Sequence, residues 1–297
     1  MIKKTNILKT LFLFVLLALA VHVHAQSSGN RHNIVLWGSA GYSNLLNDAV
    51  AVRSSGGIGA AIGVGYEWHR NRFMLQTGAE FNLHNSKLAL DDFIAYFDML
   101  DSDNPREEYI GIFEYSGSMD KYTMSYVNVP LMLGFQWERF YFLAGAKAGF
   151  NIQATSQVTT TLETAGLYFD AIEPFRNIPG RFYTREVEEN PNSLKLGLNT
   201  VASAELGFYL GDRATKNKTR YRLAVFCDYG LMNIDLNKPK ENLLLIEPYI
   251  SHQPVMNSFV KSDIFRNSHL NTFYAGVKFT VVFGLRERQN CLWILCD

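Results

Sequence analysis

The sequence lacks three features that would each point to a common class of protein. It has no excess of charge of one sign, because 28 Lys and Arg residues balance 28 Asp and Glu residues, whereas nucleic-acid-binding domains are usually basic. It has three Cys residues, too few for a disulfide framework. Beyond the N-terminal segment it has no run of about 18 uninterrupted apolar residues. We therefore expect no nucleic-acid partner and no transmembrane helix in the mature chain.

The N-terminal segment has the pattern of a cleavable signal peptide. Lys3, Lys4 and Lys9 precede an apolar run of 11 residues, 11–21, and Ala25 ends a motif that signal peptidase accepts. The run is shorter than the roughly 20 residues that a spanning helix needs, which argues against a retained anchor. We predict a signal peptide over residues 1–25 and export of the rest.

Apolar and small or polar residues alternate through residues 122–151, YTMSYVNVPLMLGFQWERFYFLAGAKAGFN. This period-2 pattern predicts two long strands joined by a tight turn at Glu138-Arg139. Pro130 lies within the first strand and suggests a β-bulge there. The apolar parity comprises Val127, Val129, Leu131, Leu133, Phe135, Trp137, Phe140, Phe142, Ala144, Ala146, Ala148 and Phe150.

Similar alternation recurs along the chain and predicts eight strands. They are residues 33–42, 57–68, 73–84, 123–137, 140–152, 200–210, 220–232 and 272–283. Short connections alternate with long ones, as in bacterial outer-membrane barrels with short periplasmic turns and long external loops. We predict an all-β, eight-stranded antiparallel up-and-down transmembrane β-barrel over residues 26–284, with residues 285–297 as a periplasmic tail.

The non-apolar parity of these strands consists mostly of small residues with about one charge per strand. A soluble barrel would expose more Lys, Thr, Glu and Arg, so this parity suits a crowded lumen and the apolar parity suits lipid. The interior of an eight-stranded barrel is just filled by side chains, and buried charges must be paired. We predict a salt-bridged, closed lumen, with an ion or proton path as the alternative. The predicted inward charges are Glu80, Lys147, Glu205, Arg222, Asp228 and Lys278.

The second long connection is acidic, but Pro105 and the absent loop Gly break the order of an EF-hand. Apolar residues between Leu88 and Leu100 recur near helical spacing. They predict a short amphipathic helix, which would either cap the barrel mouth or bind a partner. We expect no bound metal and no cofactor.

Two other groups of residues bear on chemistry. His84 with Ser86, or His269 with Ser268, could form part of an outer-leaflet hydrolase, but no nucleophile motif fixes either pair. Cys291 and Cys296 lie in the predicted periplasmic tail, where a disulfide, free thiols or pairing with another protein are all open. Cys227 is predicted to face lipid.

The stretch Tyr126-Val-Asn-Val-Pro-Leu131, followed by GFQW, a two-residue turn and FYFLAGAKAG, resembles the PorT-like outer-membrane β-barrel proteins of Bacteroides-type bacteria. The resemblance extends over about residues 34–283. It implies a barrel in the bacterial outer membrane without catalytic motifs, and one branch of that family is associated with protein secretion. We therefore expect a non-enzymatic envelope scaffold that contacts membrane lipid and other envelope proteins. The alternatives are a surface protein whose loops bind a glycan or host ligand, or a lipid-modifying hydrolase.

Overall fold

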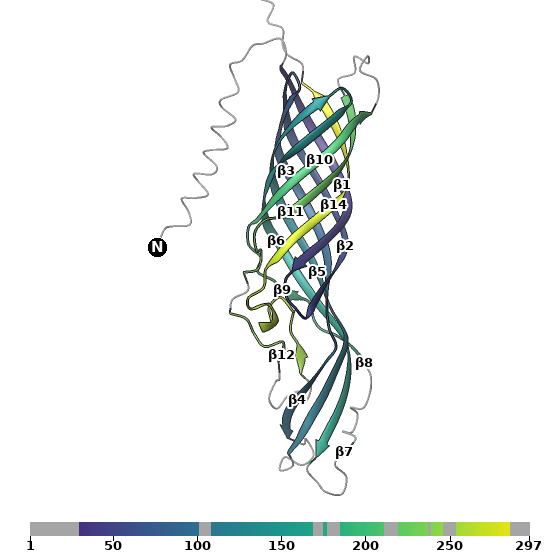
Figure 1. The fold of residues 1–297 in the computed structure, drawn as a ribbon, viewed down its shortest axis with the longest axis vertical. Helices are drawn as coiled ribbons and strands as arrows, with labels where there is room; N and C mark the ends of the chain where they lie inside the picture. Colours follow the sequence, from purple (N-terminus) through teal and green to yellow (C-terminus); the bar gives the residue numbers. More distant parts are fainter. Residues whose placement is uncertain are drawn as a thin grey trace, which may run out of the picture.

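Eight long strands form a closed, antiparallel barrel in the computed structural model (Figure 1). The structure describes residues 30–100, 108–168, 175–176, 185–210, 219–236, 239–245 and 254–285. Each strand pairs with the next, and the last pairs with the first along residues 270–284. The barrel strands are β1 (Asn30–Asn47), β2 (Val52–Arg70), β3 (Phe73–Leu90), β5 (Glu108–Trp137), β6 (Phe140–Tyr168), β10 (Asn199–Leu210), β11 (Thr219–Gly230) and β14 (Leu270–Gly284). The predicted fold and all eight predicted strands are confirmed.

Shorter elements lie at one end of the barrel (Figure 1). They are β4 (Phe93–Leu100), β7 (Phe175–Arg176), β8 (Arg185–Glu188), β9 (Asn192–Ser193), β12 (Leu244–Leu245), β13 (Val255–Met256) and a 3-10 helix, η2 (Asp263–Phe265). In the part of the chain that the structure describes, no helix has the length and apolar character to cross a membrane.

Tight turns join strands at the opposite end of the barrel. Asn71 follows β2 with φ of 58°, and Glu138 follows β5 with φ of 53°. These left-handed conformations let the chain reverse within two residues. Asn adopts this conformation more readily than Glu, and the backbone carbonyl of Glu138 accepts a hydrogen bond from Gln136 Nε2 at 3.0 Å.

Through most of its length the barrel is apolar outside and polar inside. Leu131, Leu133, Trp137 and Phe140 are each at least 60% exposed on the outer surface, while charged side chains such as Glu80 are buried within. Water would disfavour such a surface, whereas lipid hydrocarbon favours it, and closure of the barrel pairs the backbone as hydrocarbon requires. The arrangement is the reverse of that in a soluble barrel.

Toward the end of the barrel that bears the short elements, the outer face becomes polar and the inner face becomes apolar. The outward residues of β3 change from Phe81 and Leu83 to Asn85 and Lys87, while the inward residues change to Leu88 and Leu90. The sheet therefore leaves the apolar zone and acquires an apolar core and a polar surface there, as in a soluble protein.

Bulges accompany this exchange on two strands. The β2–β3 register shifts between Gly56 and Gly59. The β5–β6 register shifts at Ser125 and Tyr126, whose partners are Gln153 and Asn151, so that β6 has one extra residue, Ile152. A one-residue insertion keeps the later residues facing their proper sides although their sequence parity has changed.

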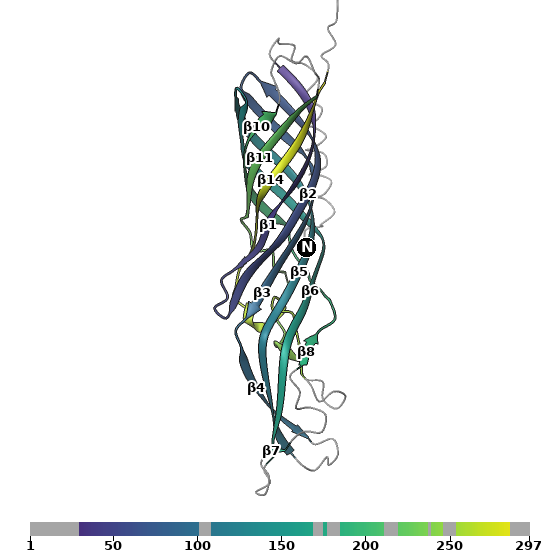
Figure 2. The same ribbon diagram turned by 90° about the vertical axis from the view of Figure 1, so that its right-hand side faces the viewer.

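Three strands continue past the barrel and form a projecting sheet (Figure 2). It consists of β4, residues 108–116 of β5 and residues 161–168 of β6, with β7 pairing β6 at the far side. β4 pairs with β5 through all eight of its residues, from Phe93 opposite Tyr115 to Leu100 opposite Glu108.

Three local predictions are wrong. The helix expected between Leu88 and Leu100 is instead the end of β3 and the edge strand β4, because its apolar residues also alternate with period 2. Pro130 causes no bulge: pairing with β3 is interrupted opposite it but resumes in the same register. Much of the long connections predicted over residues 85–122 and 153–199 is strand. The bulges break the alternation that would have extended these strands.

Candidate functional site

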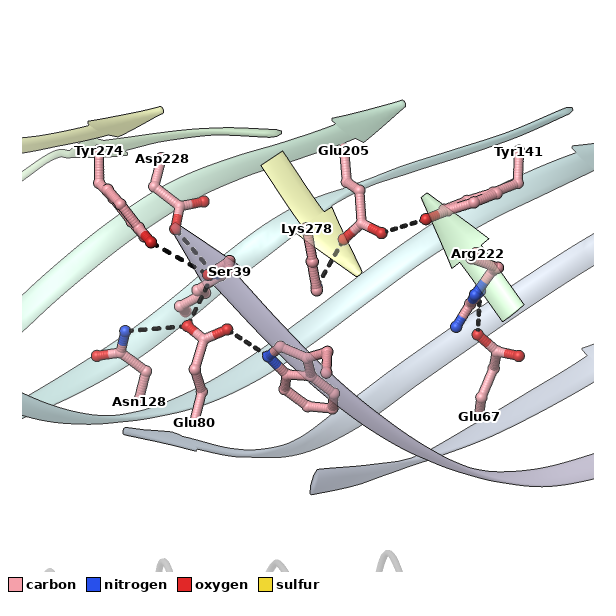
Figure 3. Close-up of polar contacts among 12 residues, drawn as sticks. Ser39, Glu67, Glu80, Asn128, Tyr141, Glu205, Arg222, Asp228, Tyr274 and Lys278 are labelled. Atoms are coloured by element: carbon pink, nitrogen blue, oxygen red, sulfur yellow. Dashed lines mark hydrogen bonds and ion pairs between the residues drawn. The ribbon is translucent and has the colours of Figure 1, made fainter. Parts of the chain in front are cut away.

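The polar lumen is one of three places where functional groups gather. It contains the six predicted inward charges, and all of them except Lys147 are labelled in Figure 3. Lys147 of β6 forms ion pairs with Glu80 Oε1 at 2.9 Å and with Asp228 Oδ2 at 2.7 Å. Trp37 Nε1 of β1 donates a hydrogen bond to the other oxygen of Glu80 at 2.7 Å. All these side chains are buried. This cluster joins β3, β6 and β11 across the interior.

A second cluster centres on Glu205 of β10. Its carboxylate accepts hydrogen bonds from Lys278 Nζ at 2.7 Å and from the Tyr141 hydroxyl at 2.5 Å. The Lys278 ammonium also lies 4.9 Å from the centre of the Trp37 ring, a cation–π distance. Since Trp37 also binds Glu80, it connects the two clusters.

The sixth predicted charge, Arg222, pairs with a residue that the sequence reasoning missed. Its Nη1 lies 2.7 Å from Glu67 Oε2, and its guanidinium lies over the rings of Tyr141 and Tyr209 at 4.8 and 5.5 Å. His69 Nε2 contacts Glu67 Oε1 at 2.5 Å. Glu67 and His69 share the parity of the inward glycines of β2, so the alternation would have found both had it been continued past Gly65.

These clusters can hold strands together but offer little acid–base chemistry. Each carboxylate of the lumen contacts a cation or histidine, and neutralised, desolvated pairs are poor proton donors and acceptors. Because breaking one pair would leave a buried charge uncompensated, each pair holds its strands in register.

The paired His and Ser residues considered for hydrolysis do not come together. His84 is buried between the rings of Tyr126 and Tyr274, at 6.1 and 5.1 Å, and the Ser86 hydroxyl oxygen accepts the Leu45 amide hydrogen. His269 Nδ1 lies 3.3 Å from Asp48 Oδ2. Among the described residues no histidine–serine hydrogen bond occurs, and no group of three metal-binding side chains is found. A nucleophile needs its base within hydrogen-bond reach.

The second place is a cap, residues 254–265, at the barrel end that bears the projecting sheet. Its side chains Met256, Phe259, Val260 and Phe265 are buried in an apolar core shared with the barrel strands. The carboxylate of Asp120 on β5 fixes the cap, because its Oδ2 accepts hydrogen bonds from the Ser258 hydroxyl and the Phe259 amide, both at 2.9 Å.

Asp120 is a buried acid outside the apolar zone, since its outward neighbours Lys121 and Thr123 are polar and exposed. Burial raises the pKa of the Asp120 carboxyl to about 6, although hydrogen bonds from Tyr122, Phe259 and Ser258 partly offset that rise. Sequence reasoning placed Asp120 in a loop and missed it. The sequence did contain a signal, because Asp120 has the same parity as Tyr122 and Met124 and therefore belongs to the same face of the strand.

The third place is the projecting sheet, which has one buried and one exposed face. Phe113 and Tyr115 lie on the buried face. Ile94, Tyr96 and Leu100 of β4 lie on the exposed face and are 49, 63 and 44% exposed. Exposed apolar side chains grouped on one sheet face commonly mark an interaction site.

The structure describes no disulfide, because Cys227 is the one cysteine among the described residues. Cys227 is a free thiol exposed on the outer face of β11, which is the orientation predicted. Cys291, Cys296 and the predicted signal peptide lie outside the described residues.

Comparison with known proteins gives a family and a weak structural likeness. The outer membrane protein beta-barrel domain family matches residues 24–235. No curated protein matches the chain. Among solved structures, Ail, the attachment invasion locus protein of Yersinia pestis, in complex with the heparin analogue sucrose octasulfate, shows 9% identity and a TM-score of 0.25, with 85% of this chain and 99% of that chain covered. The translocator domain of the autotransporter NalP from Neisseria meningitidis shows 10% identity and a TM-score of 0.14, with 94% and 96% covered.

Proposed function

The chain belongs to the outer membrane protein beta-barrel domain family, and on that premise we propose that it is a non-enzymatic scaffold of the outer membrane. In this proposal the barrel anchors the protein, the lumen is closed to solutes, and the projecting sheet contacts other envelope proteins. The finer assignment to the PorT-like, Bacteroides-type branch, with a role related to secretion, rests on the resemblance over about residues 34–283, which is most specific in the 126–150 hairpin. An N-terminal signal peptide over residues 1–25 would direct export.

The observation that carries this proposal is that the lumen and the projecting sheet differ in chemistry: charges are paired in the lumen, whereas apolar side chains are exposed on the sheet. Ion pairs link strands across the lumen, through Lys147, Lys278 and Arg222. The charges of these pairs neutralise one another and are therefore not available to a solute. The cap covers one end of the barrel with buried apolar residues. Exposed apolar groups gather on the projecting sheet instead.

The direction of the barrel follows from its turns. Outer-membrane barrels have short periplasmic turns and longer extracellular connections. The tight turns at Asn71 and Glu138 therefore face the periplasm, and the projecting sheet and cap face the outside. Partners on the cell surface or in a surface complex would meet the projecting sheet first.

Binding of a glycan or host ligand by the same extracellular region is the alternative, and the residues that the structure describes form no catalytic geometry that would support an enzymatic role. Both questions can be put to a trimmed variant in which short turns replace residues 91–117 and 160–187. The barrel of this variant should still insert, shown by heat-modifiable gel mobility. Partners that crosslink to the full chain in native membranes should be lost from the trimmed variant.

Retention of every crosslinked protein by the inserted, trimmed variant would overturn the scaffold proposal. Loss of glycan-array binding without loss of any protein partner would favour the alternative. Purified full-length protein should give no stable channels in planar bilayers, and stable conductance would contradict the closed lumen.

A further inference from the structure

We infer that the exposed face and free edge of the projecting sheet bind an extended, cationic segment of a partner protein, which adds as a strand beside β4. This rests on the proposed function and deepens it by naming the surface and the chemistry of the partner. The inference follows from the register of three strands, the positions of carboxylates around an apolar centre, and the position of β4 in the sheet.

The strand register places the exposed side chains in rows. Tyr96 of β4 lies beside Ile112 of β5, which lies beside Ala165 of β6. In the next row Asp98 lies beside Ile110, which lies beside Leu167. The centre of this face is thus an apolar patch that spans three strands in the Tyr96 row and two strands, β5 and β6, in the Asp98 row. Three paired strands hold it in register, so that it is preformed for a partner.

Carboxylates surround this apolar patch. Glu114 pairs with Ile94 in the row on one side, and Glu108 pairs with Leu100 in the row on the other. Asp98 is exposed on β4 itself. On the β4–β5 part of this face all charged positions are acidic, while apolar residues occupy the rest. A partner must therefore bring apolar side chains to the patch and positive charges to its rim.

The edge of β4 offers backbone groups as well. β4 ends the order of strands in the main sheet, and among the described residues it pairs only with β5. Its other edge therefore presents N–H and C=O groups at alternate residues, the template on which an extended peptide adds to a sheet. The exposed edge strands of natural proteins are usually protected by Lys or Pro, and β4, FIAYFDML, contains neither.

The chemistry selects among possible occupants. An anionic glycan or phosphate would be repelled by Asp98, Glu108 and Glu114, and a second copy paired through β4 would bring the same carboxylates together. A basic segment in extended conformation that adds beside β4 satisfies the free edge and meets the exposed apolar and acidic side chains of β4. In antiparallel pairing its apolar residues would lie opposite Ile94, Tyr96 and Leu100, with a Lys or Arg opposite Asp98.

A designed peptide tests this match directly. The capped peptide KVTKTVTVK places Val, Lys, Val and Val on one face, opposite Leu100, Asp98, Tyr96 and Ile94, so that its central Lys lies beside Asp98. Its binding to the full chain in nanodiscs would be measured by fluorescence anisotropy, with EVTETVTVE as the reversed-charge probe. We expect saturable binding of the first peptide, weakening as salt is raised, and no binding of the second.

Variants locate the site. The double variant Asp98→Lys, Glu114→Lys should weaken binding of the Lys peptide by at least about tenfold. Asp263→Lys, which reverses an exposed charge away from the projecting sheet, is the matched control and should leave binding unchanged. Heat-modifiable mobility would show that each variant is still folded.

N-methylated peptides test strand addition. Methyl groups on alternate amides block either the edge that faces β4 or the opposite one, so one of the two methylated peptides should lose binding and the other should retain it. Equal binding by both, no binding of the Lys peptide, or equal binding to the double variant would each overturn the inference. If the double variant keeps native crosslinked partners that the trimmed variant loses, the inference fails while the scaffold proposal stands.

Discussion

Single buried charges determine how firmly this barrel is held. Lys147 touches two carboxylates, Glu80 and Asp228, which would repel one another without it. Because all three side chains are buried, such repulsion is weakly screened. The stability of the barrel therefore depends on a few side chains whose removal costs far more than that of a surface ion pair.

Replacing Lys147 by Met should destabilise the barrel by about 3–5 kcal/mol, because two buried carboxylates lose their common cation. Urea unfolding in micelles, followed by tryptophan fluorescence, would measure the loss. Lys121→Met, at an exposed position of the neighbouring strand β5, is the matched control. A loss for Lys147→Met no greater than that of the control would contradict the structural role of the pair.

The cap should be held more firmly in acid than at neutral pH. The pKa of Asp120 in the folded protein, about 6, is above its ordinary value of 3.8, so the folded state favours the protonated form. The resulting stabilisation is complete below about pH 4 and is lost as pH rises through about 6. Hydrogen exchange of residues 254–265 should become faster over this range, because the free energy needed to open the cap falls by on the order of 3 kcal/mol.

Asp120→Asn should remove that dependence, because the amide cannot ionise yet its oxygen still accepts hydrogen bonds from Ser258 and Phe259. The same exchange experiment between pH 4 and 7 compares the two proteins, after correction for the intrinsic exchange rate. An unchanged pH profile in the variant would show that another group controls the cap.

At the scale of elements, the bulges set which side chains face the membrane. Ile152 is the extra residue of β6, and every later residue of that strand depends on it for its orientation. In β6, apolar side chains point outward before the bulge and inward after it. A one-residue change at this point therefore reverses one half against the other.

Deletion of Ile152 should leave an inserted barrel with a disordered projecting sheet, since hydrocarbon fixes the half of β6 before Ile152 and the slip falls on the half after it. Ala154, Val158 and Leu162 would then turn to water and Thr155 and Gln157 inward. Limited proteolysis of intact membranes should cut the variant above the membrane and spare the native chain. Ile152→Ala, which retains the residue count, should resist like the native chain.

The alternation of the membrane-facing half predicted the fold, the strand order and the six inward charges. It could not predict the projecting sheet or the cap, because bulges reset the parity at Ile152 and at Gly56 to Gly59. The same alternation, continued along β2, could also have predicted that Glu67 faces inward. The contact between Asp120 and Ser258 could not be predicted in this way, because it joins residues 138 positions apart through a cap that has almost no regular structure of its own.

At the scale of the whole molecule, the exchange of faces predicts where the membrane ends. Cys227, exposed on β11, should lie in hydrocarbon, whereas a cysteine at Lys121 should lie in water. A fluorophore on Cys227, in a chain with Cys291→Ser and Cys296→Ser, should be quenched by lipid-borne nitroxide. One on Lys121→Cys, with all three native cysteines replaced by serine, should be quenched by iodide. The opposite result at either site would displace the predicted boundary.

The projecting sheet also has a mechanical consequence. β5 and β6 pass from it to the tight turn at Glu138 as continuous strands, and each is hydrogen-bonded to a further barrel strand, β3 or β10. A partner pulling outward on the sheet would draw this hairpin along its own axis. The ladders on both sides would then resist in shear, with many hydrogen bonds sharing the load at once. A tether attached there would transmit force to the membrane anchor without first unzipping a strand.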